Sequence, residues 1–193
     1  APAWREWAPA LEECSRLPDV EMRVHAMGLR YRLIAGELRS VGVDVNCAPV
    51  LDVVSEHTHP VLKNRCYGQN TEDVVRIGRA VADAMIAGGV VPVMKHIPGQ
   101  GRAKHDTPAE FPEIEAPTAE LAADFAPFRS LSDLPIAMTG HVVFSALDPQ
   151  FPATLSPTVI DFVRRDLDFD GLLLTDDLSM RALTGSFADR VAG

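Results

Sequence analysis

Two hydrophobic patterns alternate along this chain, and together they predict helices and strands in turn. Short runs dominated by apolar residues, typical of buried strands, lie at 43–47, 90–95, 136–139 and 171–175. Between them, apolar residues three and four positions apart predict helices at about 20–40, 71–87, 118–130 and 156–167, with a further helical start at 178–183. The first 19 residues and the stretch 48–69 are predicted to be loops.

Capping residues place the predicted helix boundaries. Asp19 and Asn70 have side chains that can accept hydrogen bonds from the first turn of the helices that follow them. Ser156 followed by Pro157 combines a favoured N-cap residue with a proline at the first helical position. Gly88 directly follows the second apolar helix and is expected to end it.

Strands that alternate with helices predict a parallel sheet, in either a doubly wound sheet or a TIM barrel. Barrel active sites collect polar residues from the ends of several strands, and this chain has such residues after each predicted strand. We therefore predict an α/β fold, a TIM-type (β/α) barrel that is incomplete, with about the middle four or five βα units in a single domain over 1–193. The strand-end residues are Asp52, Arg65, Lys95, His96, His141, Asp176 and Asp177.

Charge and composition limit the classes of molecule that this protein is expected to bind. The formal net charge of −9 argues against nucleic acid and against an anionic membrane surface. No apolar run approaches the roughly 20 residues that a membrane-spanning helix needs. The first residues lack the order of a signal peptide, and the three cysteines have no CxxC spacing, so we expect reduced thiols and a cytoplasmic location.

Two adjacent carboxylates follow the last apolar strand. Asp176 or Asp177 can cap a helix that begins at Leu178, which is a purely structural role. The alternative is a carboxylate that the strand holds rigidly for use as a nucleophile or base. Lys95 and His96 present a similar choice, because adjacent side chains of an extended strand point in opposite directions unless the strand bends.

The histidines suggest two further hypotheses, a metal site and a histidine–carboxylate dyad. His57 and His59, together with His96 and Asp176, would be the ligands if the protein were a metal-dependent hydrolase, but a lone HxH is weak evidence for a metal site. His105 next to Asp106 forms either a histidine–carboxylate dyad or a polar turn.

Five segments, in this order, carry a family resemblance: NCAPVLDV at 46–53, NRCYG at 64–68, KHIPGQGRA at 95–103, MTGHVV at 138–143 and FDGLLLTDDLSM at 169–180. Together they resemble glycoside hydrolase family 3, specifically the cytoplasmic β-N-acetylglucosaminidases of bacterial peptidoglycan recycling. The resemblance covers nearly the whole chain. It implies a TIM-like barrel, of which this chain is the middle part.

The resemblance also implies a mechanism and its residues. Asp176 would be the nucleophile of a retaining reaction that forms a covalent glycosyl-enzyme. Arg65, Lys95 and His96 would bind the hydroxyls of N-acetylglucosamine. The implied substrate is a small carbohydrate or muropeptide. The resemblance implies neither a metal nor a cofactor, and it implies that the full-length protein is a monomer.

One loop departs from the family. The resemblance places Asp106 on the aspartate of the family's proton-transfer dyad, but it places Pro108 on the position of the catalytic histidine. Proline cannot transfer a proton, so His105 is the candidate substitute acid/base. The alternative function is a catalytically impaired or inactive fragment or pseudoenzyme that keeps part of the sugar site.

Overall fold

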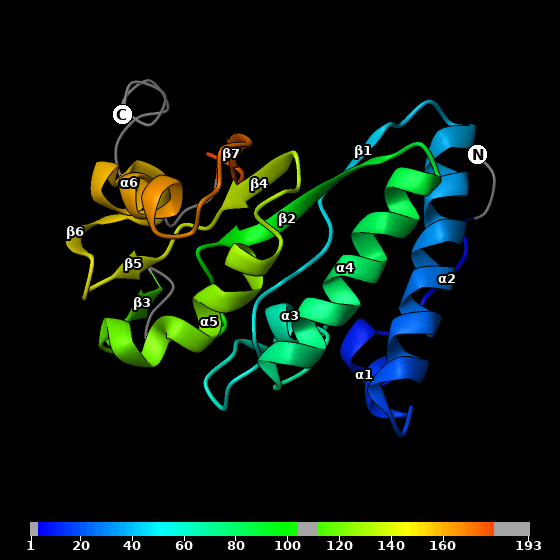
Figure 1. The fold of residues 1–193 in the computed structure, drawn as a ribbon, viewed down its shortest axis with the longest axis horizontal. Coiled ribbons are helices and arrows are strands. Elements are labelled where there is room, and N and C mark those ends of the chain that lie inside the picture. Colours follow the sequence, from blue (N-terminus) through cyan, green and yellow to red (C-terminus); the bar gives the residue numbers. More distant parts are fainter. Residues whose placement is uncertain (1–3, 104–111, 180–193) are drawn as a thin grey trace.

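The computed structural model describes residues 4–103 and 112–179 of the 193-residue chain. Its main sheet has four parallel strands in the order β1-β2-β4-β7, so that each strand lies beside the next one along the chain (Figure 1). A doubly wound sheet would reverse this order at a switch point. The sheet is therefore the wall of a TIM-type barrel that is not closed. The strands are β1 Val45–Asn46, β2 Val91–Ile97, β4 Ile136–Thr139 and β7 Leu172–Thr175.

Helices connect the parallel strands. α2 packs beside α4, and α4 packs beside α5, which gives the layer of neighbouring helices expected outside a barrel (Figure 1). Within the described residues, no helix is long and apolar enough to cross a membrane. The helices are α1 Ala10–Ser15, α2 Val20–Ser40, α3 Pro60–Lys63, α4 Thr71–Ala87, α5 Thr118–Ser130, the 3₁₀-helix η1 Ala153–Leu155 and α6 Pro157–Arg165.

The predicted helix starts are confirmed by their caps. The Asp19 carboxylate accepts a hydrogen bond from the backbone N–H of Met22 at 2.8 Å, and the Asn70 amide oxygen accepts one from Asp73 at 3.0 Å. The Ser156 hydroxyl accepts from Val159 at 3.1 Å. These bonds satisfy N–H groups that have no partner inside a helix.

Two short helices lie where loops were predicted, so that prediction was wrong. α1 lies within the first 19 residues, and it buries Ala10 and Cys14, which are one turn apart. α3 begins after His59, whose ring accepts from the N–H of Val61. Helices of six and four residues are too short to show a helical period, so the hydrophobic pattern does not reveal them.

A second, three-stranded sheet was also missed. β3 (Glu113–Ile114) pairs in parallel with β5 (Val143–Phe144), and β6 (Asp148–Pro152) pairs antiparallel with β5. Two strands of two residues each leave no alternation in the sequence. This sheet and the η1 that follows it bring Thr154 back to the end of β4, where its hydroxyl lies 3.0 Å from that of Thr139.

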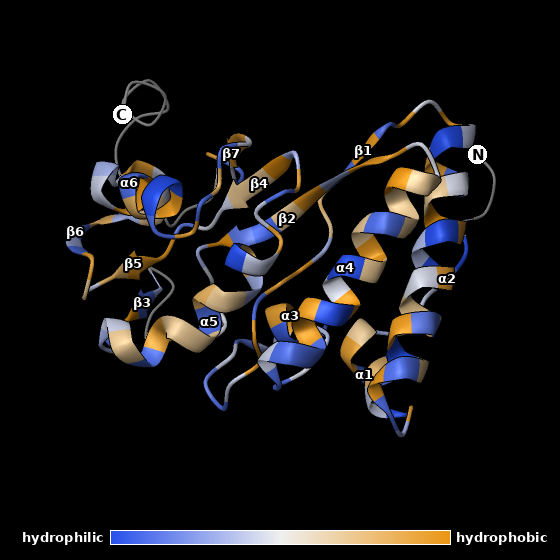
Figure 2. Ribbon diagram, viewed as in Figure 1, coloured by the Kyte–Doolittle hydropathy of each residue, from blue (hydrophilic) through white to orange (hydrophobic). Residues whose placement is uncertain are grey.

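The core fills the space between the helices and the strands. Ile77 and Met85 of α4, Met94 of β2 and Phe128 of α5 are fully buried. In Figure 2 the strands β2 and β4 are mostly hydrophobic in colour, whereas α2 and α4 alternate between hydrophobic and hydrophilic residues. The main sheet is thus covered on its helical side by one continuous apolar layer.

Apolar surface also remains uncovered at both ends of the sheet. On α2, Leu29 and Leu33 are one turn apart and exposed, with Leu29 55% accessible. Leu172 of β7 is 58% accessible, and each of β1 and β7 pairs with one strand among the described residues. Unpaired strand edges and apolar helix faces of this kind favour association between molecules.

The 193-residue chain, produced by itself, is expected to be marginally stable and to self-associate, because these edges and faces are open. Light scattering coupled to size-exclusion chromatography should show species larger than the monomer. Replacing Leu29 and Leu33 with Lys and Glu should reduce the association while leaving the helical circular dichroism unchanged, since neither side chain is in the core. A monomer with a cooperative thermal transition would contradict this expectation.

Candidate active site

Three polar side chains converge at the carboxyl ends of the parallel strands. Asp52 follows β1, His96 lies near the end of β2, and Asp176 follows β7. Asp52 is inaccessible to solvent and His96 is 2% accessible; a carboxylate oxygen of Asp52 lies 2.7 Å from Nδ1 of His96. On the other side of the ring, Nε2 lies 4.0 Å from Oδ2 of the partly exposed Asp176. A buried carboxylate therefore holds a buried imidazole that faces a second, accessible carboxylate.

An irregularity in β2 separates the side chains of Lys95 and His96. Lys95 pairs with Met138 of β4 while Ile97 pairs with Thr139, so the register shifts across His96. The peptide bond between Lys95 and His96 is cis. His96 contacts Asp52, whereas Lys95 lines a neighbouring pocket. Both residues of the pair thus lie in the strand-end region, with different surroundings.

The turn after β2 is fixed to the loop that follows β1. The backbone N–H of Gln100 donates to Oδ1 of Asp52 at 2.8 Å. The carbonyl of Gly101 accepts hydrogen bonds from the hydroxyls of Ser55, at 3.1 Å, and Thr58. A Cβ on residue 101 would lie 1.9 Å from the carbonyl oxygen of Val53, so only glycine fits this approach.

The same turn is also attached to α5. Nε of Arg102 donates to the buried carboxylate of Asp124 at 2.6 Å. Burial raises the pKa of Asp124, and the hydrogen bond from Arg102 opposes that shift. The segment 104–111 begins two residues after Arg102, so His105, Asp106 and Pro108, the predicted acid/base region, lie outside the described residues.

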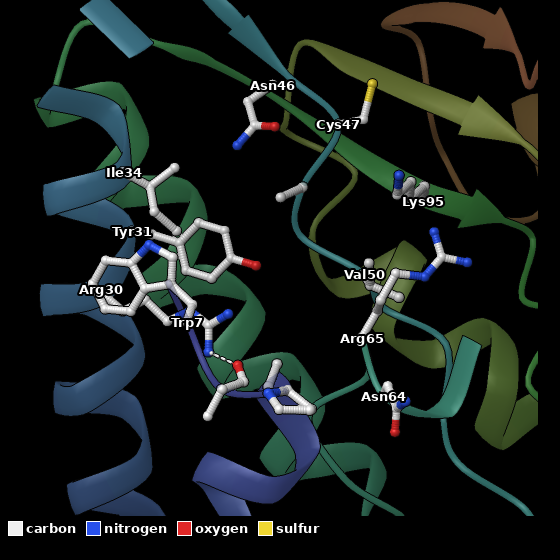
Figure 3. A pocket seen from close by; sticks show the side chains of 14 residues that line it. Trp7, Arg30, Tyr31, Ile34, Asn46, Cys47, Val50, Asn64, Arg65 and Lys95 are labelled. Atoms are coloured by element: carbon white, nitrogen blue, oxygen red, sulfur yellow. Dashed lines mark hydrogen bonds between the residues drawn. The ribbon is translucent and has the colours of Figure 1, made fainter. Parts of the chain in front are cut away.

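A pocket of about 400 Å³ opens beside this cluster (Figure 3). Lys95 and Arg65 lie close together on one side of it, next to Cys47. Burial lowers the pKa of the Lys95 ammonium, and the nearby Arg65 lowers it further, while Cys47 and Asp176 act in the opposite direction. The described residues that line the pocket include no aspartate or glutamate. The two predicted sugar-binding cations thus share one wall.

The opposite wall comes from residues that the sequence pattern did not single out. Trp7 lies over the guanidinium of Arg30, with the ring centre 5.2 Å from Cζ, and Tyr31 is beside them (Figure 3). Nη1 of Arg30 donates to the carbonyl of Ala8 at 2.9 Å and to Glu13 at 2.6 Å. Because these residues precede the first predicted strand, no strand-end argument identifies them. An amphipathic aromatic ring near the start of the chain is a signal that could have pointed to this wall.

The neighbours Asp176 and Asp177 have different roles. Oδ1 of Asp177 accepts from the N–H of Ser179 at 2.8 Å, a contact within the turn at 178–179; most of the helix expected at 178–183 lies outside the described residues. Oδ1 of Asp176 accepts from the N–H of Asp177 at 2.8 Å, and its Oδ2 faces His96. The strand end therefore leaves Asp176 as the carboxylate that points into the cluster.

His141 supports the end of β7. Its Nε2 lies 3.1 Å from the carbonyl oxygen of Asp177, and its Nδ1 lies 2.9 Å from the hydroxyl of Thr154. Because a carbonyl can only accept, Nε2 carries the proton in this contact. His141 thus connects η1 to the chain just after Asp176.

The histidines that the metal-dependent hydrolase hypothesis requires as ligands have other partners. His57 lies 3.2 Å from the carboxylate of Glu56, and His59 caps α3. His96 is bonded to Asp52. Within 4–103 and 112–179, no group of three or more His, Cys, Asp or Glu side chains is placed to hold a metal ion.

Comparison of the sequence with known protein families finds a family of glycosidases. The sequence profile described as "Glycosyl hydrolase family 3 N terminal domain" matches residues 9–192. The chain belongs to glycosyl hydrolase family 3. A beta-hexosaminidase from Methylococcus capsulatus is 38% identical over 164 residues, which are 82% of this chain and 48% of that protein. A beta-hexosaminidase from Thioalkalivibrio sulfidiphilus is 33% identical over 197 residues, covering 97% of this chain and 56% of that protein.

A solved structure confirms the fold of this family 3 chain. NagZ from Neisseria gonorrhoeae, in complex with N-trifluoroacetyl-D-glucosamine, superimposes with a TM-score of 0.84 at 32% identity, over 96% of this chain and 56% of NagZ. The predicted incomplete barrel is thereby confirmed. The chain spans about half the length of the curated relatives it matches.

The lowered pKa of Lys95 leads to a stability prediction for the full-length protein. Burial disfavours the charged ammonium, so unfolded chains bind more protons between the folded pKa of Lys95 and its usual 10.5, and stability rises with pH in that window. Lys95→Met should therefore raise the melting temperature at pH 7 by a few degrees. This gain should shrink as the pH approaches 10.5.

Thermal melts from pH 7 to about 10.5 measure this effect. Lys63→Met is the control, because Lys63 lies in the last turn of α3, where a cation interacts favourably with the helix dipole. It should give no stabilisation. A loss of stability in Lys95→Met at pH 7 would show that the ammonium is satisfied in the folded protein.

Proposed function

We propose that this chain is part of the catalytic domain of a retaining β-N-acetylhexosaminidase, with Asp176 as the nucleophile. The observation that supports this most directly is the position of Asp176. Its carboxylate is held at a strand end with one oxygen directed to a buried histidine and remains 30% accessible, so a substrate can reach it. The beta-hexosaminidase relatives make a glycosidic bond the expected target.

The proposed reaction has two steps. Asp176 attacks the anomeric carbon, the bond to the leaving oxygen breaks, and a covalent glycosyl-enzyme forms. Water then attacks the same carbon and releases the sugar with its original configuration. The first step requires a proton for the leaving oxygen, and the second requires a base for the water. In this chain His105, with Asp106 as its partner, is the candidate for both tasks.

The proposed substrate is a terminal β-linked N-acetylglucosamine of a peptidoglycan-derived muropeptide. Sugar hydroxyls taken out of water must be hydrogen-bonded, and Lys95, Arg65 and His96 are polar groups at the site that can bond them. The N-acetylglucosamine analogue named in the NagZ complex is consistent with this class. Neither a metal nor a cofactor has a step in this reaction. We further propose that residues 1–193 belong to one domain and that the full-length protein acts as a monomer in the cytoplasm of a bacterium.

Asp176 and Asp177 provide a matched pair of variants for the nucleophile. In the full-length protein, Asp176→Ala should lower kcat for an aryl N-acetylglucosaminide by about 10⁴-fold or more, because the covalent step is lost. Asp177→Asn should keep most of the activity, since an amide oxygen can still accept from the N–H of Ser179. The rate of aryl alcohol release measures both. Normal turnover by the Asp176 variant would exclude it as nucleophile.

One sequence feature supports a second candidate function, an impaired or inactive sugar-binding protein. Pro108 occupies the position that the family resemblance assigns to the catalytic histidine. Proline has no proton to transfer and fixes its own backbone angle. The site on the strand ends would then bind the sugar while hydrolysis is slow or absent.

Azide distinguishes the two functions. If the nucleophile works but proton transfer is impaired, an activated aryl substrate should form the glycosyl-enzyme, and azide, which needs no base, should accelerate its breakdown. Impaired proton transfer would thus give a several-fold higher steady-state rate and a glycosyl azide product. A rate unaffected by azide would indicate intact acid/base catalysis, and no activity under either condition would favour the sugar-binding protein.

A further inference from the structure

The Asp52 carboxylate has both oxygens occupied and no contact with solvent. Oδ2 lies 2.7 Å from Nδ1 of His96, and Oδ1 accepts from the N–H of Gln100 at 2.8 Å. A carboxylate taken out of water is tolerated where such partners replace its hydration. Asp52 therefore cannot reach a substrate itself. Any effect it has on the site must act through the two groups that it holds.

The first of these effects concerns which nitrogen of His96 carries the proton. An ionised carboxylate only accepts hydrogen bonds, so the contact with Asp52 requires a proton on Nδ1. In the neutral ring, Nε2 is then left with its lone pair and faces Asp176. The 4.0 Å separation is too long for a direct hydrogen bond between Nε2 and Asp176. It suits a ligand hydroxyl that donates to the nitrogen.

The second effect concerns the turn at residues 98–101. Gln100 and Gly101 form this turn, and its backbone is bonded to Asp52 through one residue and to Ser55 through the other. His96, which precedes the turn, is bonded to the other oxygen of Asp52. One carboxylate thus fixes the orientation of the imidazole relative to the turn that follows it.

We propose that Asp52 is a positioning residue, which fixes the Nδ1–H form of His96 and so presents Nε2 as the acceptor for a substrate hydroxyl next to Asp176. This proposal rests on the proposed glycosidase function, because the substrate hydroxyl is that of the bound sugar. It assigns a role to a residue that makes no substrate contact. The same carboxylate keeps the ring in register with the turn at 98–101.

Asp52→Asn separates this role from simple packing. The amide has nearly the same shape, and its oxygen can still accept from Gln100, but its NH₂ group then meets Nδ1 of His96 and moves the ring proton to Nε2. The reverse amide orientation would set two donors against each other at Gln100. The variant should therefore change the tautomer of His96 while the fold is kept.

Two measurements on the full-length protein test the proposal. Nitrogen-15 NMR, with His96 signals assigned by their loss in His96→Gln, should show the neutral ring protonated on Nδ1 in the wild type and on Nε2 in Asp52→Asn. The value of kcat/KM for an aryl N-acetylglucosaminide should fall by about 100-fold, because the site then offers a donor where an acceptor is required. Asp124→Asn is the control, since it alters a buried carboxylate that is bonded to the same turn through Arg102 and should leave the His96 tautomer unchanged.

Each outcome decides the proposal. A wild-type ring protonated on Nε2, an unchanged tautomer in Asp52→Asn, or a changed tautomer with wild-type kcat/KM would overturn it. If Asp52→Asn fails to fold, the wild-type spectrum alone decides, because the proposal requires Nδ1–H. If the wild-type protein hydrolyses no substrate, the proposed function fails, whereas the tautomer in the two spectra still supports or overturns the positioning by Asp52.

Discussion

The Asp52 carboxylate, buried between the chain after β1 and the end of β2, is the contact on which the rest of the site depends. It bonds the ring of His96 with one oxygen and the backbone of Gln100 with the other. Without these donors, a charge at full burial would strongly destabilise the fold. The loop after β1, the histidine and the turn after β2 must therefore be in place together, and each is correctly placed only when the other two are.

The order of the strands makes this arrangement useful for chemistry. β1, β2, β4 and β7 are parallel neighbours, so their carboxyl ends open at one edge of the sheet. Residues that are far apart in sequence, such as Asp52 and Asp176, then lie on opposite sides of a single imidazole. The pocket with Lys95 and Arg65 adjoins this cluster. The two cations thus lie near the Asp176 carboxylate, and neither cation is in the core.

Much of this structure could be predicted from the sequence, and the reasons are local. Asp19, Asn70 and Ser156 cap helices through contacts within three residues, so the starts of these helices can be predicted from the adjacent sequence. The strand 91–97 is a largely buried run, and a polar residue at the end of such a run in a parallel sheet lies at the active edge. His96 and Asp176, both predicted at the strand ends, do lie near each other.

What could not be predicted depends on contacts between distant residues. Asp52 was one polar strand-end residue among several, and its bond to His96 involves positions 44 residues apart. Trp7 and Arg30 form a pocket wall from outside the strand pattern, and the pairing of β3 with β5 involves two residues on each strand. The choice between Asp176 and Asp177 likewise required the position of Ser179, because either carboxylate could have accepted a hydrogen bond from the chain that follows.

We propose that the strand-end cluster is a sugar site with Asp176 directed at the anomeric carbon. A crystal structure of the full-length protein with N-acetylglucosamine bound tests it most directly. We expect the anomeric carbon next to the Asp176 carboxylate, with sugar hydroxyls bonded to Lys95, Arg65 and Nε2 of His96. A sugar bound elsewhere, or bound here with its anomeric carbon turned away from Asp176, would contradict it.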